Sequence, residues 1–174
     1  RNQHNDNVEG EALIFLNNFG SESLTDPSTI VEASDMQLHR AKELYEKIYA
    51  KADYSIASST KQDDGTFAVK VNIRPLNILH LLSDNAEAGF EDFWTKFDAV
   101  DTDSMTEEEL TSWYENTFAA EYYDTLLDLL EEQIDNMDYM EEKSIVIQVQ
   151  QDKEDDSLFF SQEDWSNLDY LIID

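Results

Sequence analysis

Hydrophobic residues recur at three- and four-residue spacing from Ser34 to Tyr49, which predicts an amphipathic helix. Ser34 and Gln37 have the spacing of a capping box, and they mark the start of this helix. Its apolar stripe consists of Leu38, Ala41, Leu44, Tyr45, Ile48 and Tyr49. Before the helix, we expect a polar leader at residues 1–29 that contains a short helix at 9–19.

A period of two follows and predicts two β-hairpins. In the first, the alternating positions are Tyr54, Ile56 and Ser58, then Phe67, Val69, Val71 and Ile73. Gly65 supplies the turn of this hairpin, because glycine tolerates a positive φ, and Pro75 ends its second strand. The second hairpin has Ile145, Ile147 and Val149, a polar turn at Asp152–Ser157 and a return strand at Leu158–Ser161.

Helical patterns fill the region between the two hairpins. We expect a short apolar helix at Leu76–Leu82 and another that Asp84 caps, with Phe90, Phe93, Trp94 and Phe97 on one side. A capping box at Thr106 and Glu109 begins a longer helix that runs to about Met140 without Pro or Gly. Residues Trp165–Ile173 are expected to close the chain as a turn or a short strand.

The apolar face of the long helix changes side near Ala119–Glu121. Leu110, Trp113, Tyr114, Thr117 and Phe118 share one side, and Leu126, Leu127, Leu130, Ile134 and Met137 lie nearly opposite. Two interpretations stay open: two helices meet at this point, or one helix packs against different neighbours along its length.

These patterns predict an α+β fold, in which an antiparallel sheet of two hairpins carries helices on one face. Cystatin-like and nuclear-transport-factor-like folds have such an arrangement and serve as analogies. We expect a single domain over residues 30–174, preceded by the leader at 1–29.

Acidic residues dominate the C-terminal half. The chain of 174 residues has 40 acidic and 11 basic residues and a net charge of −29. Such a surface repels phosphates and anionic headgroups, so we expect no nucleic-acid partner and no membrane contact through the domain itself. It attracts a basic protein or weakly bound divalent cations. The simpler interpretation is a solvated face that serves solubility.

One acidic stripe is the candidate contact surface for a partner. Its members are three or four residues apart, and they are Glu121, Asp124, Asp128, Glu131, Asp135 and Asp138. Like charges at this spacing destabilise a helix by about 0.2–0.5 kcal/mol per pair. Packing of the opposite face can outweigh that cost without any ligand.

No residue pattern indicates a catalytic, cofactor or metal site. The chain has no Cys, and its three His have no metal-binding spacing. Residues Asp152–Glu163 partly imitate a calcium loop, but a β-turn between two strands explains them more simply. A second acidic cluster, at Asp98, Asp101 and Asp103, is interpreted as a solvated helix entry, and His80 as a packed residue at the edge of the core. We interpret Trp94, Trp113 and Trp165 as packing residues, in preference to sugar-stacking ones.

The stretch Ala41–Lys47, followed by Asp64–Pro75, resembles domains of unknown function in lipoproteins of Gram-positive bacteria, over about residues 30–150. The resemblance implies secretion, a lipid-anchored Cys upstream and a tether, which agrees with the polar leader. The sequence contains no lipobox Cys, and the resemblance supplies no active-site residues.

The leading hypothesis is a non-enzymatic extracytoplasmic binding or structural module, lipid-anchored at the cell surface. The alternative is an acidic intracellular inhibitor, either an immunity protein or a mimic of nucleic-acid charge, that uses the acidic stripe to bind a basic partner. An enzyme ranks third.

Overall fold

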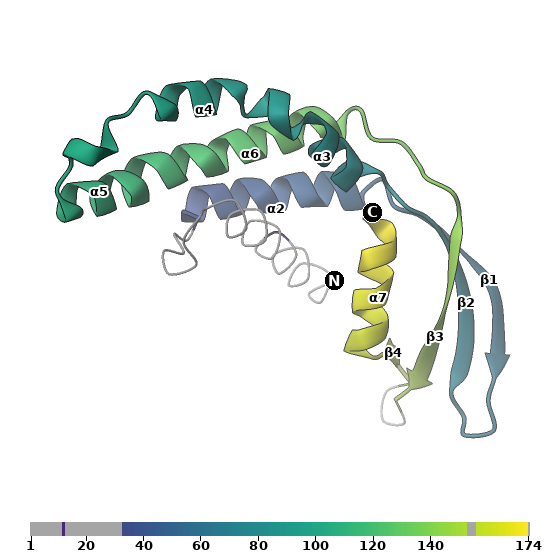
Figure 1. Ribbon diagram of the computed structural model, residues 1–174. Helices are drawn as coiled ribbons and strands as arrows, with labels where there is room; N and C mark the ends of the chain where they lie inside the picture. The colour runs from purple at the N-terminus through teal and green to yellow at the C-terminus, as the bar shows by residue number, and fades with distance from the viewer. Residues whose placement is uncertain (1–11, 13–32, 153–155, 174) are drawn as a thin grey trace. The chain divides into compact units, whose positions relative to one another are not determined.

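The computed structural model describes residues 12, 33–152 and 156–173, and it confirms an α+β fold (Figure 1). Except for Ala12, the predicted leader lies outside the described residues. Contacts divide the chain into two compact units, which we describe separately. Among the described residues, the helical unit comprises 12, 33–48 and 82–136, and the sheet unit comprises 49–81, 137–152 and 156–173. The single domain over 30–174 stays a prediction.

The helical unit contains α2, most of α3, and the elements from α4 to α6. Their bounds are α2 Asp35–Tyr49, α3 Ile78–Gly89, α4 Glu91–Asp98, the 3₁₀-helix η1 Thr102–Ser104, α5 Glu107–Trp113, the π-helix η2 Tyr114–Phe118 and α6 Ala119–Ile134. The predicted stripe of α2 packs in the core, since Ala41, Leu44, Tyr45 and Ile48 are buried.

Both predicted capping boxes are present. The Gln37 amide N–H donates to Ser34 Oγ at 3.3 Å, and Ser34 N donates to Gln37 Oε1 at 2.9 Å. Thr106 and Glu109 exchange the same pair of bonds at the start of α5. These bonds satisfy backbone donors that have no partner inside a helix, so they determine where α2 and α5 begin.

One uninterrupted helical run, Glu107–Ile134, explains the change of apolar face. Its π-helical segment η2 joins α5 to α6, and Ala119 N donates to the carbonyl of Tyr114, five residues back. A π-turn holds one more residue than an α-turn, so it rotates the following helix by about 100° relative to the preceding one. The change of face therefore arises inside a single helical run, without a break between two helices.

Aromatic rings from α4 and from the α5–α6 run form much of the core of the helical unit. Phe97 meets Trp113 at 5.8 Å between ring centroids, and Phe93 meets Phe118 at 5.1 Å. After the π-segment, Tyr122 lies 5.1 Å from Phe90. The extra residue thus lets rings on both sides of the π-segment reach the same face of α4.

Two predicted helix boundaries in this region are wrong. Helix α3 passes through Asp84, and the break comes at Gly89, with Phe90 as the N-cap of α4. At the start of α3, Leu76 instead forms β-bridges with Tyr139 and Ile173. A capping sequence favours a helix start, but the continuous α3 provides the backbone of Asp84 with helical partners. A Cβ added to Gly89 would lie 2.9 Å from Leu129 Cδ1, so α3 approaches α6 closely where it ends.

The predicted extension of the long helix to Met140 is also wrong, because the helix ends at Ile134. Beyond it, Met140 N donates to the Pro75 carbonyl at 2.8 Å, and Tyr139 pairs with Leu76. Both partners belong to the sheet unit, so pairing over a long sequence distance replaces the helical hydrogen bonds that the local pattern favours.

The sheet unit contains the two predicted hairpins in one four-stranded antiparallel sheet of order β1-β2-β3-β4. The strands are β1 Asp53–Lys61, β2 Phe67–Arg74, β3 Lys143–Gln151 and β4 Leu158–Phe160. Val71 of β2 lies opposite Ile56 on one side and Ile145 on the other, which places these side chains on one face.

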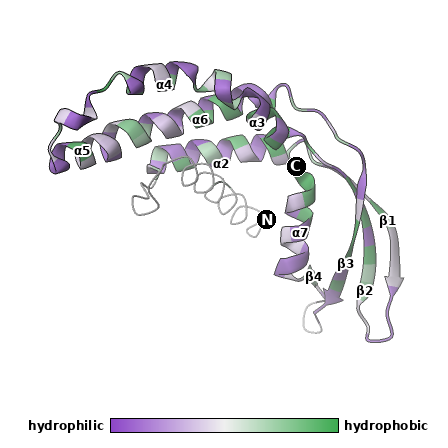
Figure 2. Ribbon diagram, viewed as in Figure 1, coloured by the Kyte–Doolittle hydropathy of each residue, from purple (hydrophilic) through white to green (hydrophobic). Residues whose placement is uncertain are grey.

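Helix α7, Gln162–Ile172, covers that face of the sheet. Leu168, Leu171 and Ile172 pack against a buried cluster of Val71, Ile73 and Ile147. The first turn of α7 is hydrophilic and its C-terminal half is hydrophobic (Figure 2). The turn or strand predicted at Trp165–Ile173 is therefore wrong. Ser161 Oγ caps the helix by accepting from Asp164 N at 3.0 Å, and the apolar residues then match the helical spacing.

Candidate functional site

The acidic stripe lies mainly along α6. Glu121, Asp124, Asp128 and Glu131 belong to this helix, and Asp135 is its C-cap. Asp138 follows in the sheet unit, where its backbone and side chain bond to Asn77 and Tyr139. The first five members therefore lie together in the helical unit, and Asp138 belongs to the sheet unit.

Basic side chains of α2 pair with the middle of the stripe. Arg40 Nη2 lies 2.7 Å from Asp128 Oδ1 and 2.8 Å from Glu131 Oε2. Lys47 Nζ lies 3.4 Å from Glu131 Oε1. The hydrogen bond from Arg40, followed by that from Lys47, lowers the pKa of Glu131 below its ordinary value. The stripe thus lies against cations that are more than 80 residues away in sequence.

The N-terminal half of the stripe has partners of its own. Gln37 is buried, and its Nε2 donates to Asp124 Oδ1 at 2.9 Å and to the Ala120 carbonyl at 2.8 Å. Lys96 of α4 pairs with Glu121. Intramolecular contacts therefore offset part of the local repulsion. Asp128 nevertheless remains 72% exposed, and contact of the stripe with a partner stays a prediction.

A shallow, wide-open hollow of about 740 Å³ lies beside the π-segment. Its lining comes from one helical run: Thr106, Glu107, Glu108, Thr111, Ser112, Glu115 and Asn116. Two of its polar groups already bond to their own helix, since Asn116 Nδ2 donates to the Ser112 carbonyl and Thr111 Oγ1 to the Glu107 carbonyl, both at 2.9 Å. No sequence pattern predicts this hollow, and the signals nearest to it are the capping box at Thr106 and the change of apolar face.

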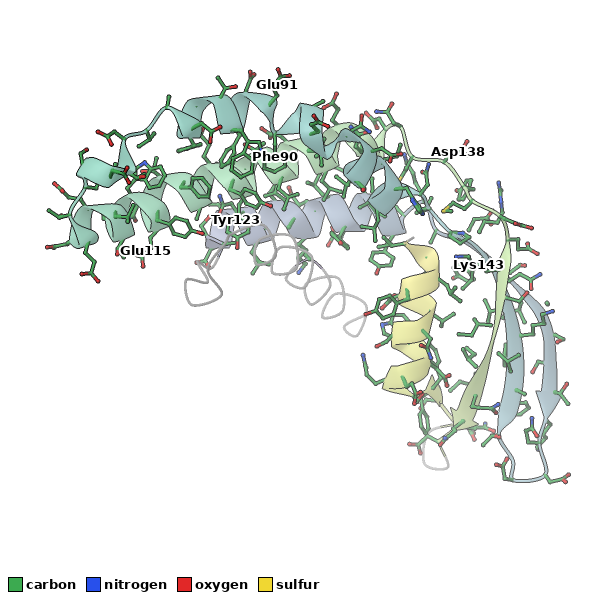
Figure 3. All side chains as sticks on the ribbon, viewed as in Figure 1. Phe90, Glu91, Glu115, Tyr123, Asp138 and Lys143 are labelled. Carbon is green, nitrogen blue, oxygen red and sulfur yellow. The ribbon has the colours of Figure 1, made fainter. Side chains whose placement is uncertain are left out.

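Charged and aromatic side chains of the helical unit separate clearly (Figure 3). Glu91 and Glu115 point outward from their helices, whereas Phe90 and Tyr123 point into the interior of the unit. Burial raises the pKa of Tyr123 above its ordinary value. The acids therefore form the solvent side of this unit, and the rings form its interior.

The calcium-like segment follows the simpler interpretation as far as the structure describes it. Residues 153–155 lie outside the described part, and the flanking strands β3 and β4 pair as a hairpin. Asp152 N donates to the Ser157 carbonyl at 2.8 Å, and Glu163 lies in the first turn of α7. Within residues 33–152 and 156–173, no group of three or more His, Asp or Glu side chains is arranged to hold a metal ion.

The remaining candidates mostly have packing or solvent roles. Asp98, Asp101 and Asp103 are exposed around η1, and His39 is exposed beside Glu43. His80 is exposed on α3, which contradicts its predicted place at the core edge. The helix turns His80 outward because Ile78 and Leu82 occupy the buried side. Trp94 and Trp113 contact neighbouring rings edge to face, and Trp165 contacts Phe160 at a tilt.

The two edges of the sheet differ in how far their backbone groups are covered. Beyond the last β4 pair, Asp164 Oδ2 accepts from Gln148 N at 3.2 Å and so covers the edge of β3. Strand β1 pairs with β2 on one side, and eight of its nine residues are exposed. Helix α7 packs against the cluster on β2 and β3, which are the neighbouring strands. Tyr54 and Ile56 of β1 are 66% and 69% exposed.

No protein-family model matches the sequence, and no curated protein matches it either. A solved structure does. It is the crystal structure of ycdA from Bacillus subtilis, described as a candidate lipoprotein, with a TM-score of 0.58 and 18% sequence identity. The match covers 98% of this chain and 46% of ycdA, so the chain spans about half the length of that protein. At this identity, the likeness shows a shared fold.

Among the helices that the structure describes, none combines the length and the hydropathy of a transmembrane span.

Proposed function

We propose that this chain is a non-enzymatic extracytoplasmic binding or structural module that a lipid anchor upstream holds at the cell surface. The observation that carries the proposal is the shared fold with ycdA, described as a candidate lipoprotein, over nearly the whole chain. The resemblance of Ala41–Lys47 and Asp64–Pro75 to lipoprotein domains supports it independently, because it rests on sequence.

The use of the buried polar side chains supports a non-enzymatic role. Among the described residues, Gln37 and Gln133 are the buried polar ones. Gln37 caps α2 and ties it to α6, and Gln133 accepts from Asn85 Nδ2 at 3.5 Å. Catalytic groups are usually buried acids, bases or nucleophiles with strongly shifted pKa values. These two amides instead hold helices together.

Charge supports attachment through a tether. A net charge of −29 repels the anionic surface of a bilayer, so the folded chain does not bind such a membrane directly. The same charge attracts a basic protein or divalent cations, which are the partners that we propose. The intracellular-inhibitor alternative requires the acidic stripe as its contact surface, and five of the six stripe carboxylates already bond within the chain.

The test uses the native protein in its own host. We expect metabolic incorporation of a fatty acid into the protein, and its digestion when intact cells are treated with protease. A cytosolic protein of the same cells should stay unlabelled and intact. Recovery of the unlabelled protein in the cytosolic fraction, from a gene without a signal sequence, would overturn the proposal.

A further inference from the structure

We draw no further inference here: the strongest candidate, the outer edge of strand β1 with the exposed side chains of Tyr54 and Ile56, carries none because nothing in the structure shows what covers it.

Discussion

At the scale of single residues, the buried side chain of Gln37 joins the start of α2 to α6. Its side-chain oxygen accepts hydrogen bonds from Ser34 at the start of α2. Its side-chain nitrogen donates to Ala120 and Asp124 on α6. We expect Gln37→Leu to lower the free energy of unfolding by about 1–3 kcal/mol, because it removes the Gln37 half of the capping box and both hydrogen bonds from Gln37 to α6. Urea unfolding followed by tryptophan fluorescence measures the change, since Trp94 and Trp113 both lie in this unit.

Met36 offers the matched control, because it neighbours Gln37 on α2 and is 82% exposed. Met36→Ala should change the free energy of unfolding by no more than about 0.5 kcal/mol. Equal effects of the two substitutions would contradict the role assigned to Gln37.

Glu131 bonds to two cations of α2, so its ionisation affects the contact between α2 and α6. Its folded pKa is lowered by Arg40 and then Lys47, so it contributes stability above its ordinary pKa of 4.5. That contribution is lost as the pH falls through the lower folded pKa. We therefore expect wild type to be more stable than Glu131→Gln at pH 7, and the difference to shrink below about pH 4.5.

Chemical denaturation of both proteins across this pH range measures the difference. Glu132→Gln is the control, because Glu132 is a neighbouring exposed acid of α6. A stability difference between wild type and Glu131→Gln that stays constant from pH 7 to below the folded pKa would show that the carboxylate charge does not hold the two helices together.

At the scale of elements, the π-segment η2 decides which residues of α5 and α6 share a face. Deletion of Asn116 would convert the segment to a regular α-helix and rotate α5 by about 100° relative to α6. Trp113 would then lose its contact with Phe97. We expect the free energy of unfolding to fall by more than about 2 kcal/mol, in line with the removal of a large aromatic side chain from a core.

The substitution Asn116→Ala separates the extra residue from its side chain. It removes the bond from Asn116 Nδ2 to the Ser112 carbonyl and keeps the residue count, so it should cost no more than about 1 kcal/mol. Thermal unfolding followed by circular dichroism compares the two variants. If the deletion were as mild as the substitution, the π-segment would not determine the packing.

The elements also show which local signals suffice. Both capping boxes and the turn at Gly65 are predicted correctly, because each depends on residues at most four positions apart. Gly65 adopts a φ of +92°, and Gln62 N donates to the Thr66 carbonyl across the turn at 2.8 Å. Helix α7 is missed, because its apolar pattern covers few residues and its packing depends on Val71 and Ile73 of β2, which are far away in the sequence.

At the scale of the whole molecule, the excess of acids opposes folding through repulsion between like charges. Three cations, Arg40, Lys47 and Lys96, pair with the acidic stripe through solvent-exposed contacts. Exposed pairs of this kind contribute little, so screening should relieve more repulsion than it removes attraction. We expect the melting temperature to rise when NaCl is increased from roughly 0.02 M to 0.5 M.

A variant with fewer charges tests the cause. The triple variant Glu107→Gln, Glu108→Gln and Glu115→Gln lacks three exposed charges. Its melting temperature should therefore rise less with added NaCl than that of wild type. A melting temperature that falls with added NaCl in wild type would mean that attractive ion pairs outweigh the repulsion.

By itself, the sequence determined the α+β class, the two hairpins, the start of α2 and α5, and the position at which the long helix changes its buried face. All of these follow from periodicity or from hydrogen bonds between near neighbours. The tertiary structure alone decided that a π-segment makes this change, that α7 covers the sheet, and that Arg40, Lys47 and Gln37 meet the acidic stripe. Those contacts join residues far apart in the chain, and their energies depend on which surfaces meet, which no local pattern records.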